Sequence, residues 1–401
     1  MLSFEIVSKS GPALAQKENL MKRTYILPVI FALILCGCSI AINQSPVAAP
    51  SLQSDETPTP ALNGGVSQQS MTPTAPYPTV NIPVTWAGLN LTGRLVYINA
   101  AQGINDPILS INILDLLTGG ITPIFQGPDV SWIYYVTISP DGKQLIMSYS
   151  APPQNHNPVN QDLYIMPLDG SKPPQLFIAP PTQYDQYIQA EWSPDGRYIY
   201  YVHNNYQNQP IGQHYPIYEL YRVAYPDGQP EKIADQAFWP RLSADGSRLV
   251  YISMDPTTGK NKIFLANADG SNTQEVVLSG AWTPDIIDAP IFSPDGQSIM
   301  FSSLSPPQTS APNWVEKLFG IQVAEAHSNP SDWWSVPLMG GTVTRLTSIQ
   351  ATGLFASISP DKRYLASYSG GGLFVMNPDG TNLTMLIPDM GGIPGTLSWI
   401  P

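Results

Sequence analysis

Short runs of apolar and β-branched residues alternate with turn residues along most of the chain. The repeated unit is an apolar residue, a Ser-Pro-Asp-Gly turn and a β-rich run, as in Trp192–Gly196 followed by RYIYYVH. Proline presets the φ angle of such a turn, aspartate bonds to its own backbone and glycine takes the left-handed position. Each copy therefore predicts a β-hairpin. The serines of the five copies are Ser139, Ser193, Ser243, Ser293 and Ser359.

A second turn follows each of these hairpins. It is an Asp-Gly turn in four copies and Gly340-Gly341 in the copy that begins at Ser293. Four strands joined by tight hairpins are the pattern of a propeller blade. The motif serines lie 54, 50, 50 and 66 residues apart, so the fourth interval contains an insertion. In the last copy Lys362 replaces the turn glycine, and we expect that turn to be strained or of another type.

The two ends of the repeat region supply one further blade between them. Leu397–Pro401 matches the unit up to its proline, and Leu91-Thr-Gly93 followed by RLVYIN matches what comes after it. We therefore predict an all-β fold, a six-bladed β-propeller over residues 84–401 with split-blade closure and the C-terminal strand innermost. A free sheet edge is thereby avoided. The alternative is a truncated sixth repeat with an unrelated N-terminus.

The N-terminal region has the pattern of a targeting signal. Lys22 and Arg23 precede an apolar run of eleven residues, 25–35, which is too short to span a bilayer. The following Leu35-Cys-Gly-Cys38 resembles the lipobox of bacterial lipoproteins. That resemblance implies cleavage before Cys38 and a diacylglycerol on its sulfur, which would attach the protein to a membrane. An ordinary secretory signal with a chance cysteine is the alternative.

These features divide the chain into three parts. Residues 1–37 are expected to be the lipoprotein signal, with 1–20 a misassigned start and Met21 the initiator. Residues 38–83, rich in proline, threonine and serine, are expected to form an extended, disordered tether. The propeller follows from residue 84. We therefore expect an extracytoplasmic protein, anchored by lipid to a bacterial membrane at the periplasmic side or the cell surface.

The charge content and the motifs of the chain exclude some classes of function. Only 12% of the 401 residues are charged, the formal net charge is −12 and no run of lysine or arginine occurs. A nucleic-acid partner is therefore not expected, because such binding needs a basic surface. No Gly-x-Ser-x-Gly elbow or phosphate-binding glycine loop is present. We expect a monomer with no cofactor.

The repeated apolar-Ser-Pro-Asp-Gly unit resembles the PD-type, WD-like repeats in the propeller of the TolB family. The resemblance covers residues 84–401 and implies the propeller fold. Fold alone does not define function. The TolB family also has a small α/β domain before its propeller, where this chain has only the tether, and TolB is free in the periplasm rather than lipidated.

The loops of such a propeller predict where a site would lie. The Asp-Gly turns share one face, whereas the connections between second and third strands and between blades share the other face and are long, polar and aromatic. Binding residues usually lie on loops held by a rigid scaffold. The candidate ligand or partner residues near the channel mouth are Trp132, Tyr187, Trp239, Trp282 and Asp288. The alternative is that the aromatic members pack against neighbouring blades.

Other residues have weaker signals. The four histidines, His156, His203, His214 and His327, fall in or beside long loops and are expected to be exposed. They lack a metal-ligand spacing, so no metal site is expected. Glu191 and Arg241 occupy equivalent positions in adjacent blades and are expected to form an interblade ion pair rather than a catalytic site.

The insertion, residues 304–332, contains Trp314, Leu318, Phe319 and Ile321 at helical spacing. It either caps the propeller or binds a partner, and Trp314 joins the candidate binding residues. The function predicted from the sequence is a non-enzymatic module that binds a protein or a cell-envelope polymer. The alternative is a carbohydrate-active enzyme, a lyase or glycosidase acting on the long-loop face.

Overall fold

A computed structural model describes residues 77–101, 108–128, 131–151, 160–182, 184–205, 217–255, 258–305, 330–388 and 396–401. The chain divides into two units, residues 1–65 and 66–401, and all described residues belong to the second. Among them, no helix is long and apolar enough to cross a membrane. The signal, Cys38 and the insertion around Trp314 lie outside the described residues.

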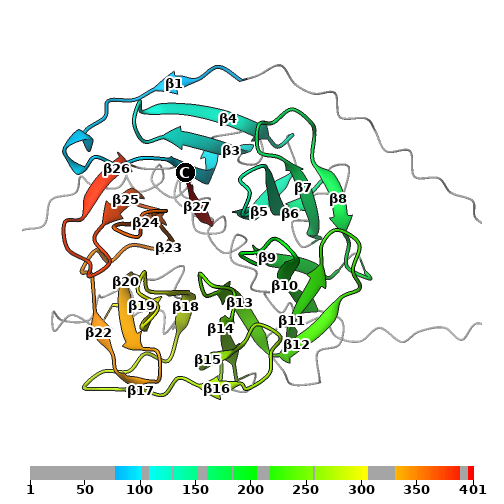
Figure 1. Ribbon diagram of the computed structural model, residues 1–401, viewed down its shortest axis with the longest axis vertical. Coiled ribbons are helices and arrows are strands. Elements are labelled where there is room, and N and C mark those ends of the chain that lie inside the picture. The colour runs from blue at the N-terminus through cyan, green and yellow to red at the C-terminus, as the bar shows by residue number, and fades with distance from the viewer. Residues whose placement is uncertain are drawn as a thin grey trace, which may run out of the picture. The chain divides into compact units, whose positions relative to one another are not determined.

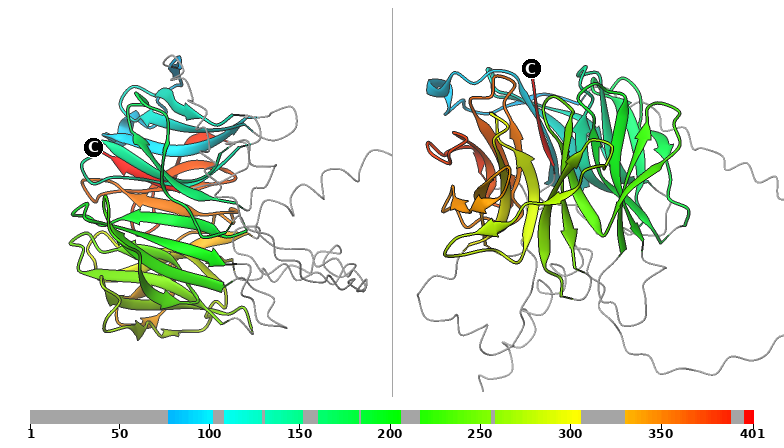
Figure 2. Two further views of the ribbon diagram at one scale, coloured as in Figure 1. Left: turned by 90° about the vertical axis from the view of Figure 1, so that its right-hand side faces the viewer. Right: turned by 60° about the horizontal axis from the view of Figure 1, so that its bottom comes forward.

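The described residues of the second unit form a six-bladed β-propeller, as predicted (Figure 1 and Figure 2). Each blade is an antiparallel meander that runs from the central channel outward. Blade 1 contains β27 (Leu397–Ile400), β2 (Arg94–Ala101), β3 (Ile108–Asp115), β4 (Gly120–Gln126) and β1 (Val80–Asn81). Blade 2 contains β5 (Trp132–Ile138), β6 (Gln144–Ser150), β7 (Asp162–Pro167) and β8 (Gln175–Ile178). Blade 3 contains β9 (Gln186–Trp192), β10 (Tyr198–Asn205), β11 (Ile217–Ala224) and β12 (Glu231–Asp235).

The remaining blades follow the same plan. Blade 4 contains β13 (Ala237–Leu242), β14 (Arg248–Met254), β15 (Asn261–Asn267) and β16 (Gln274–Glu275). Blade 5 contains β18 (Ile287–Phe292), β19 (Ser298–Leu304), β20 (Ser331–Pro337) and β22 (Thr344–Arg345). Blade 6 contains β23 (Phe355–Ile358), β24 (Leu365–Ser369), β25 (Gly372–Met376) and β26 (Thr384–Pro388). Outside the blades, β17 (Leu278–Ser279) pairs in parallel with β21 (Gly341–Thr342), and η1 (Ala87–Leu89) is a single 3-10 turn.

Blade 1 is the predicted split blade. The innermost strand, β27, pairs antiparallel with β2, and Leu95 lies opposite Trp399. Trp399 is buried and donates its indole N–H to the carbonyl of Thr92 at 2.9 Å. The strand β1 adds a fifth member to this sheet, so residues expected to belong to the tether before residue 84 are part of the blade.

The motif turns are locked by side chains. In the blade 3 copy, the hydroxyl of Ser193 donates to Asp195 at 2.7 Å and the backbone N–H of Tyr198 donates to Ser193 at 2.9 Å. The turn with Lys362 has the same hydrogen bonds, including Ser359 to Asp361 at 2.7 Å. Lys362 adopts φ 62°, against 71° for Gly196. The turn is therefore of the same type, with lysine in the left-handed conformation that glycine occupies elsewhere.

Aromatic side chains from alternate blades meet in the channel. Tyr135 of blade 2 and Phe355 of blade 6 each lie with their ring centroid 5.4 Å from that of Trp239 in blade 4. All three residues stand four positions before their motif serine. At the same position Tyr135, Gln189, Trp239 and Ala289 have positive φ, next to a register shift in the inner strand. The β-bulges at Tyr135 and Trp239 re-aim these two side chains toward their contact, whereas the strand of Phe355 pairs without a register shift.

Polar contacts join the inner strands of adjacent blades. The predicted pair between Glu191 and Arg241 is confirmed. Burial raises the pKa of Glu191, whereas the neighbouring Arg241 opposes that rise. The backbone N–H of Trp239 donates to the Gln189 amide oxygen at 2.7 Å, and the Thr396 hydroxyl donates to the carbonyl of Val136 at 2.8 Å. The channel lining therefore links blades 1 to 2 and 3 to 4.

The second turn of most blades rests on the backbone of the preceding blade. A Cβ on Gly380 of blade 6 would lie 2.0 Å from the carbonyl oxygen of Leu346, at the end of blade 5, and one on Gly170 of blade 2 would lie 2.8 Å from that of Ile124 in blade 1. Glycine is required at Gly380 both for its φ of 83° and for this approach.

Replacing Gly380 with alanine should therefore cost far more stability than replacing the motif-turn glycine Gly296. Both glycines have positive φ, but a Cβ on Gly296 meets nothing within 4 Å. Gly296→Ala should lower the free energy of unfolding by about 1 kcal/mol, and Gly380→Ala by about 1–3 kcal/mol more because of the clash. Urea unfolding of both variants measures the difference, and equal losses would contradict this role of the second turn.

Candidate functional site

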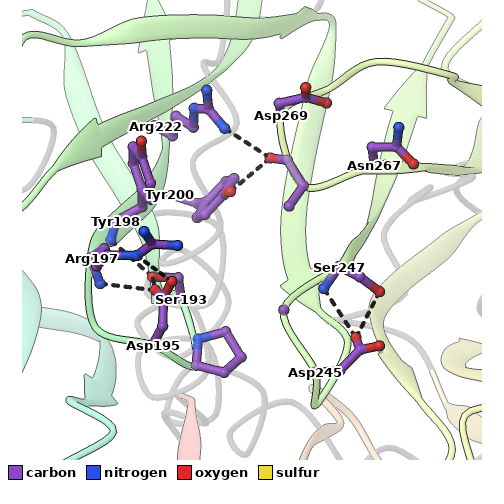
Figure 3. Close-up of a pocket in the computed structure, with 13 residues that line it drawn as sticks. Ser193, Asp195, Arg197, Tyr198, Tyr200, Arg222, Asp245, Ser247, Asn267 and Asp269 are labelled. Carbon is purple, nitrogen blue, oxygen red and sulfur yellow. Dashed lines mark hydrogen bonds and ion pairs between the residues drawn. The ribbon is translucent and has the colours of Figure 1, made fainter.

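A groove lies between blades 3 and 4 on the face that carries the Asp-Gly turns, the short-turn face (Figure 3). Its volume is about 400 Å³, within the range of small-ligand sites. One wall consists of blade 3 residues: Ser193, Pro194, Asp195, Arg197, Tyr198, Tyr200 and Arg222. The other wall consists of blade 4 residues: Asp245, Gly246, Ser247, Asn267, Ala268 and Asp269.

Arg222 is the central side chain of the blade 3 wall. Its guanidinium Nε and Nη2 donate to one oxygen of Glu231 at 2.9 and 2.8 Å. The guanidinium carbon lies 4.8 Å from the ring centroid of Tyr198, a cation–π contact. Nη1 approaches the carbonyl of Ala268 on the opposite wall at 3.5 Å, and the hydroxyl of Tyr200 donates to that carbonyl at 2.7 Å. These contacts hold the two walls in register.

Tyr200 and Arg222 depart from the repeat. They lie opposite each other in the ladder between β10 and β11. In blade 5 the corresponding pair is Met300 and Ser335. In the other four blades both residues of the pair are apolar: Val96–Ile113, Ile146–Ile165, Val250–Leu265 and Ala366–Val375. An apolar pair at this position packs between blades, whereas a tyrosine and an arginine need polar partners. The groove is polar because of this exchange.

The blade 4 wall presents two carboxylates from two turns. Asp245 accepts from the hydroxyl of Ser243 at 2.6 Å and from the backbone N–H of Ser247 at 3.0 Å, and these bonds lower its pKa to about 2. Asp269 accepts from the hydroxyl and backbone N–H of Ser271 at 2.6 and 2.9 Å, which likewise lower its pKa. Both carboxylates are therefore ionised at neutral pH.

The groove can recognise a ligand by charge and hydrogen bonds. Its arginines are held by carboxylates, Arg222 by Glu231 and Arg197 by Asp195 at 2.6 Å. Its aspartates are held by serines. A proton-transfer catalyst needs a group whose pKa is near the working pH. The hydrogen bonds from the serines instead lower the pKa of Asp245 and of Asp269. The arrangement is suited to binding.

The residues predicted as binding candidates are mostly buried in the propeller. Trp132, Tyr187, Trp239 and Asp288 are all buried. Trp132 stacks on Tyr134 at 6.0 Å between centroids, Tyr187 lies 4.7 Å from Tyr201 and Trp239 packs in the channel. Trp282 is partly buried and stacks on Trp334 at 4.2 Å. Trp314 lies outside the described residues, and these contacts do not gather the other five into one place.

His203 is not the exposed loop residue that the sequence suggested. It is buried in β10, where its Nε2 lies 3.4 Å from Asp185 and its Nδ1 lies 3.3 Å from Glu219. Glu219 also pairs with Lys232 at 2.8 Å. The expectation was wrong because His203 lies within β10 rather than in the loop that follows, and its ring packs 5.2 Å from that of Tyr187. His156, His214 and His327 lie outside the described residues, and no cluster of three potential metal ligands occurs among those that are described.

Sequence reasoning missed the groove because the short turns that flank it seemed too small to form a site. The signal was present in the repeats themselves. Aligning the strands that follow each motif serine places Tyr200 where the other copies have Ile146, Val250, Met300 and Ala366. A polar residue that breaks a repeated apolar position indicates a special local environment.

Comparison with known proteins supports the fold. No family model matches the chain. TolB from Acinetobacter baumannii is 16% identical over 77% of this chain and 67% of that chain, with a TM-score of 0.52. A chain of a nidogen/laminin complex is 9% identical over 76% and 97%, with a TM-score of 0.51. An oligogalacturonate lyase in complex with manganese is 13% identical over 74% and 86%, with a TM-score of 0.46, too slight to carry a conclusion. The chain therefore has a TolB-like six-bladed propeller fold.

The aspartates of the motif turns, which accept hydrogen bonds from the motif serines, should make the free energy of unfolding decrease in acid. The Ser193 hydroxyl and the backbone N–H of Arg197 lower the pKa of Asp195 to about 2, as Ser243 does for Asp245. A carboxylate with a lowered pKa stabilises the fold above its unfolded value near 3.9, and that stabilisation is lost as the pH falls toward 2.

We therefore expect the melting temperature to decrease from about pH 4 downward, and Ser193→Ala with Ser243→Ala to decrease less steeply over that range. Ser298→Ala is the control, because the contact that Ser298 makes with its motif turn uses its backbone N–H. Melting curves at a series of pH values test this, and parallel curves for wild type and double variant would contradict it.

Proposed function

We propose that the protein is an extracytoplasmic β-propeller, held at a bacterial membrane by an acylated Cys38, which binds a protein or a cell-envelope polymer without catalysing a reaction. The observation that carries the proposal is the groove between blades 3 and 4. Its charged side chains are fixed by Glu231, Asp195 and the turn serines, and a rigid, preorganised polar surface favours binding. We propose a monomer that binds no nucleic acid.

One observation favours the alternative, a carbohydrate-active enzyme on the long-loop face. His203 lies between Asp185 and Glu219, and neither Asp185 Oδ1 nor His203 Nε2 has a hydrogen-bond partner despite burial. A buried polar atom without a partner in a native structure calls for an explanation, of which a catalytic role is one. A histidine flanked by carboxylates is a common acid–base arrangement.

Two assays on the purified mature protein separate these functions. In the first, the protein is sedimented with insoluble cell-wall material and compared with a bovine serum albumin control. In the second, it is incubated with polygalacturonate and Mn²⁺, and the ultraviolet absorbance of unsaturated products is followed. We expect sedimentation without turnover. Turnover that His203→Ala abolishes would replace the binding proposal with the enzyme.

The lipid anchor has its own test. Cys38→Ser removes the sulfur that would carry the diacylglycerol, so the variant should be released from membranes or retained only by its uncleaved signal. Cys36→Ser is the matched control and should be labelled and retained as wild type. Metabolic labelling with a fatty acid, followed by membrane fractionation, measures both properties. Label that still enters Cys38→Ser would show that Cys38 is not the acylated residue.

A further inference from the structure

The charges of the groove do not cancel. Arg197 is paired with Asp195, and Arg222 with Glu231. On the opposite wall, Asp245 and Asp269 accept hydrogen bonds from neutral serines. The charge of Arg222 across the groove helps to lower the pKa of Asp269, but within the described residues no lysine or arginine forms an ion pair with either aspartate. The blade 4 wall therefore keeps two negative charges across a groove of about 400 Å³.

The bonds to the serines also fix the carboxylates in place. Each aspartate uses Oδ1 for its turn, which leaves Oδ2 for another donor. Both turns belong to hairpins, that of Asp245 between β13 and β14 and that of Asp269 between β15 and β16. An incoming cation would therefore meet two acceptors that are already oriented and ionised, so little conformational entropy would be lost on binding.

We propose that this groove binds a basic segment of a partner protein, with lysine or arginine side chains directed at Asp245 and Asp269. The inference rests on the proposed binding function and names its ligand class. The groove is far larger than a single metal ion requires, and Arg222 with Tyr198 and Tyr200 forms a polar wall opposite the carboxylates (Figure 3). The net charge of −12 would add a favourable long-range attraction for a basic partner.

The repeat supplies a matched control for the test. Asp295 of blade 5 occupies the position of Asp245 and accepts from Ser293 at 2.6 Å and from the N–H of Gln297 at 3.0 Å. Asp379 of blade 6 occupies the position of Asp269 and accepts from both groups of Thr381 at 2.6 and 2.9 Å. Neither lines the groove. Replacing either pair with asparagine removes two charges from equivalent turns of the same face.

The probe is a fluorescein-labelled peptide of alternating lysine and glycine, with a peptide of alternating glutamate and glycine as its counterpart. Anisotropy should show binding of the lysine peptide alone, weakened by added salt. Asp245→Asn with Asp269→Asn should reduce the affinity about tenfold, because two charge pairs are lost. Asp295→Asn with Asp379→Asn should leave it within about twofold.

Several results would overturn the inference. An equal loss of affinity for the lysine peptide in both double variants would mean that the peptide responds only to the overall charge of the short-turn face. Tighter binding of a chitosan oligomer than of the peptide, lost in the same groove variant, would assign the groove to a cationic polymer. Absence of peptide binding by a protein that still sediments with cell-wall material would refute this inference and leave the proposed function standing.

Discussion

A ring of sheets is stable only if its first and last members are joined, and in this protein backbone hydrogen bonds between β27 and β2 make that join. The join has consequences beyond blade 1. Trp399 of β27 packs with Tyr97 of β2 and with Tyr368 and Leu373 of blade 6, and its backbone N–H donates to the Ser357 hydroxyl of that blade at 2.9 Å. Closure therefore organises the core on both sides of the junction between blades 6 and 1.

Contacts between neighbours then set the spacing of the other blades. Second-turn glycines such as Gly380 approach a carbonyl of the preceding blade, and inner-strand pairs such as Glu191 and Arg241 join adjacent blades at the channel. At one junction this general scheme is changed. Tyr200 and Arg222 replace an apolar pair, and the space between blades 3 and 4 becomes a polar groove. A polar groove thus arises where two residues of one blade differ from their equivalents in the other blades.

The sequence predicted the features that repeat and missed those that depend on a single blade. The motif turns, the split blade and the ion pair between Glu191 and Arg241 follow from position within the unit, and the structure confirms them. The burial of His203 could not be predicted, because it depends on where β10 ends and which face its side chain takes. The conformation of Lys362 was undecided, since a turn sequence does not say whether lysine will accept a left-handed φ.

The channel residues show a related limit. Tyr135, Trp239 and Phe355 occupy equivalent positions, yet β-bulges shift the register of the inner strand beside Tyr135 and Trp239 only. Periodicity alone does not locate a bulge. The same is true of the candidates Trp132 and Tyr187, whose aromatic character was consistent with either binding or packing, and which pack in the structure.

The position of β27 in the chain also determines when the ring can close. This strand follows all others in the sequence, whereas its partner β2 is among the first. Until residues 397–400 are available for pairing, β2 has an unpaired inner edge, and such an edge can pair with other chains. The ring therefore cannot close before β27 has been synthesised, and a chain that lacks this strand exposes an edge that the folded propeller does not.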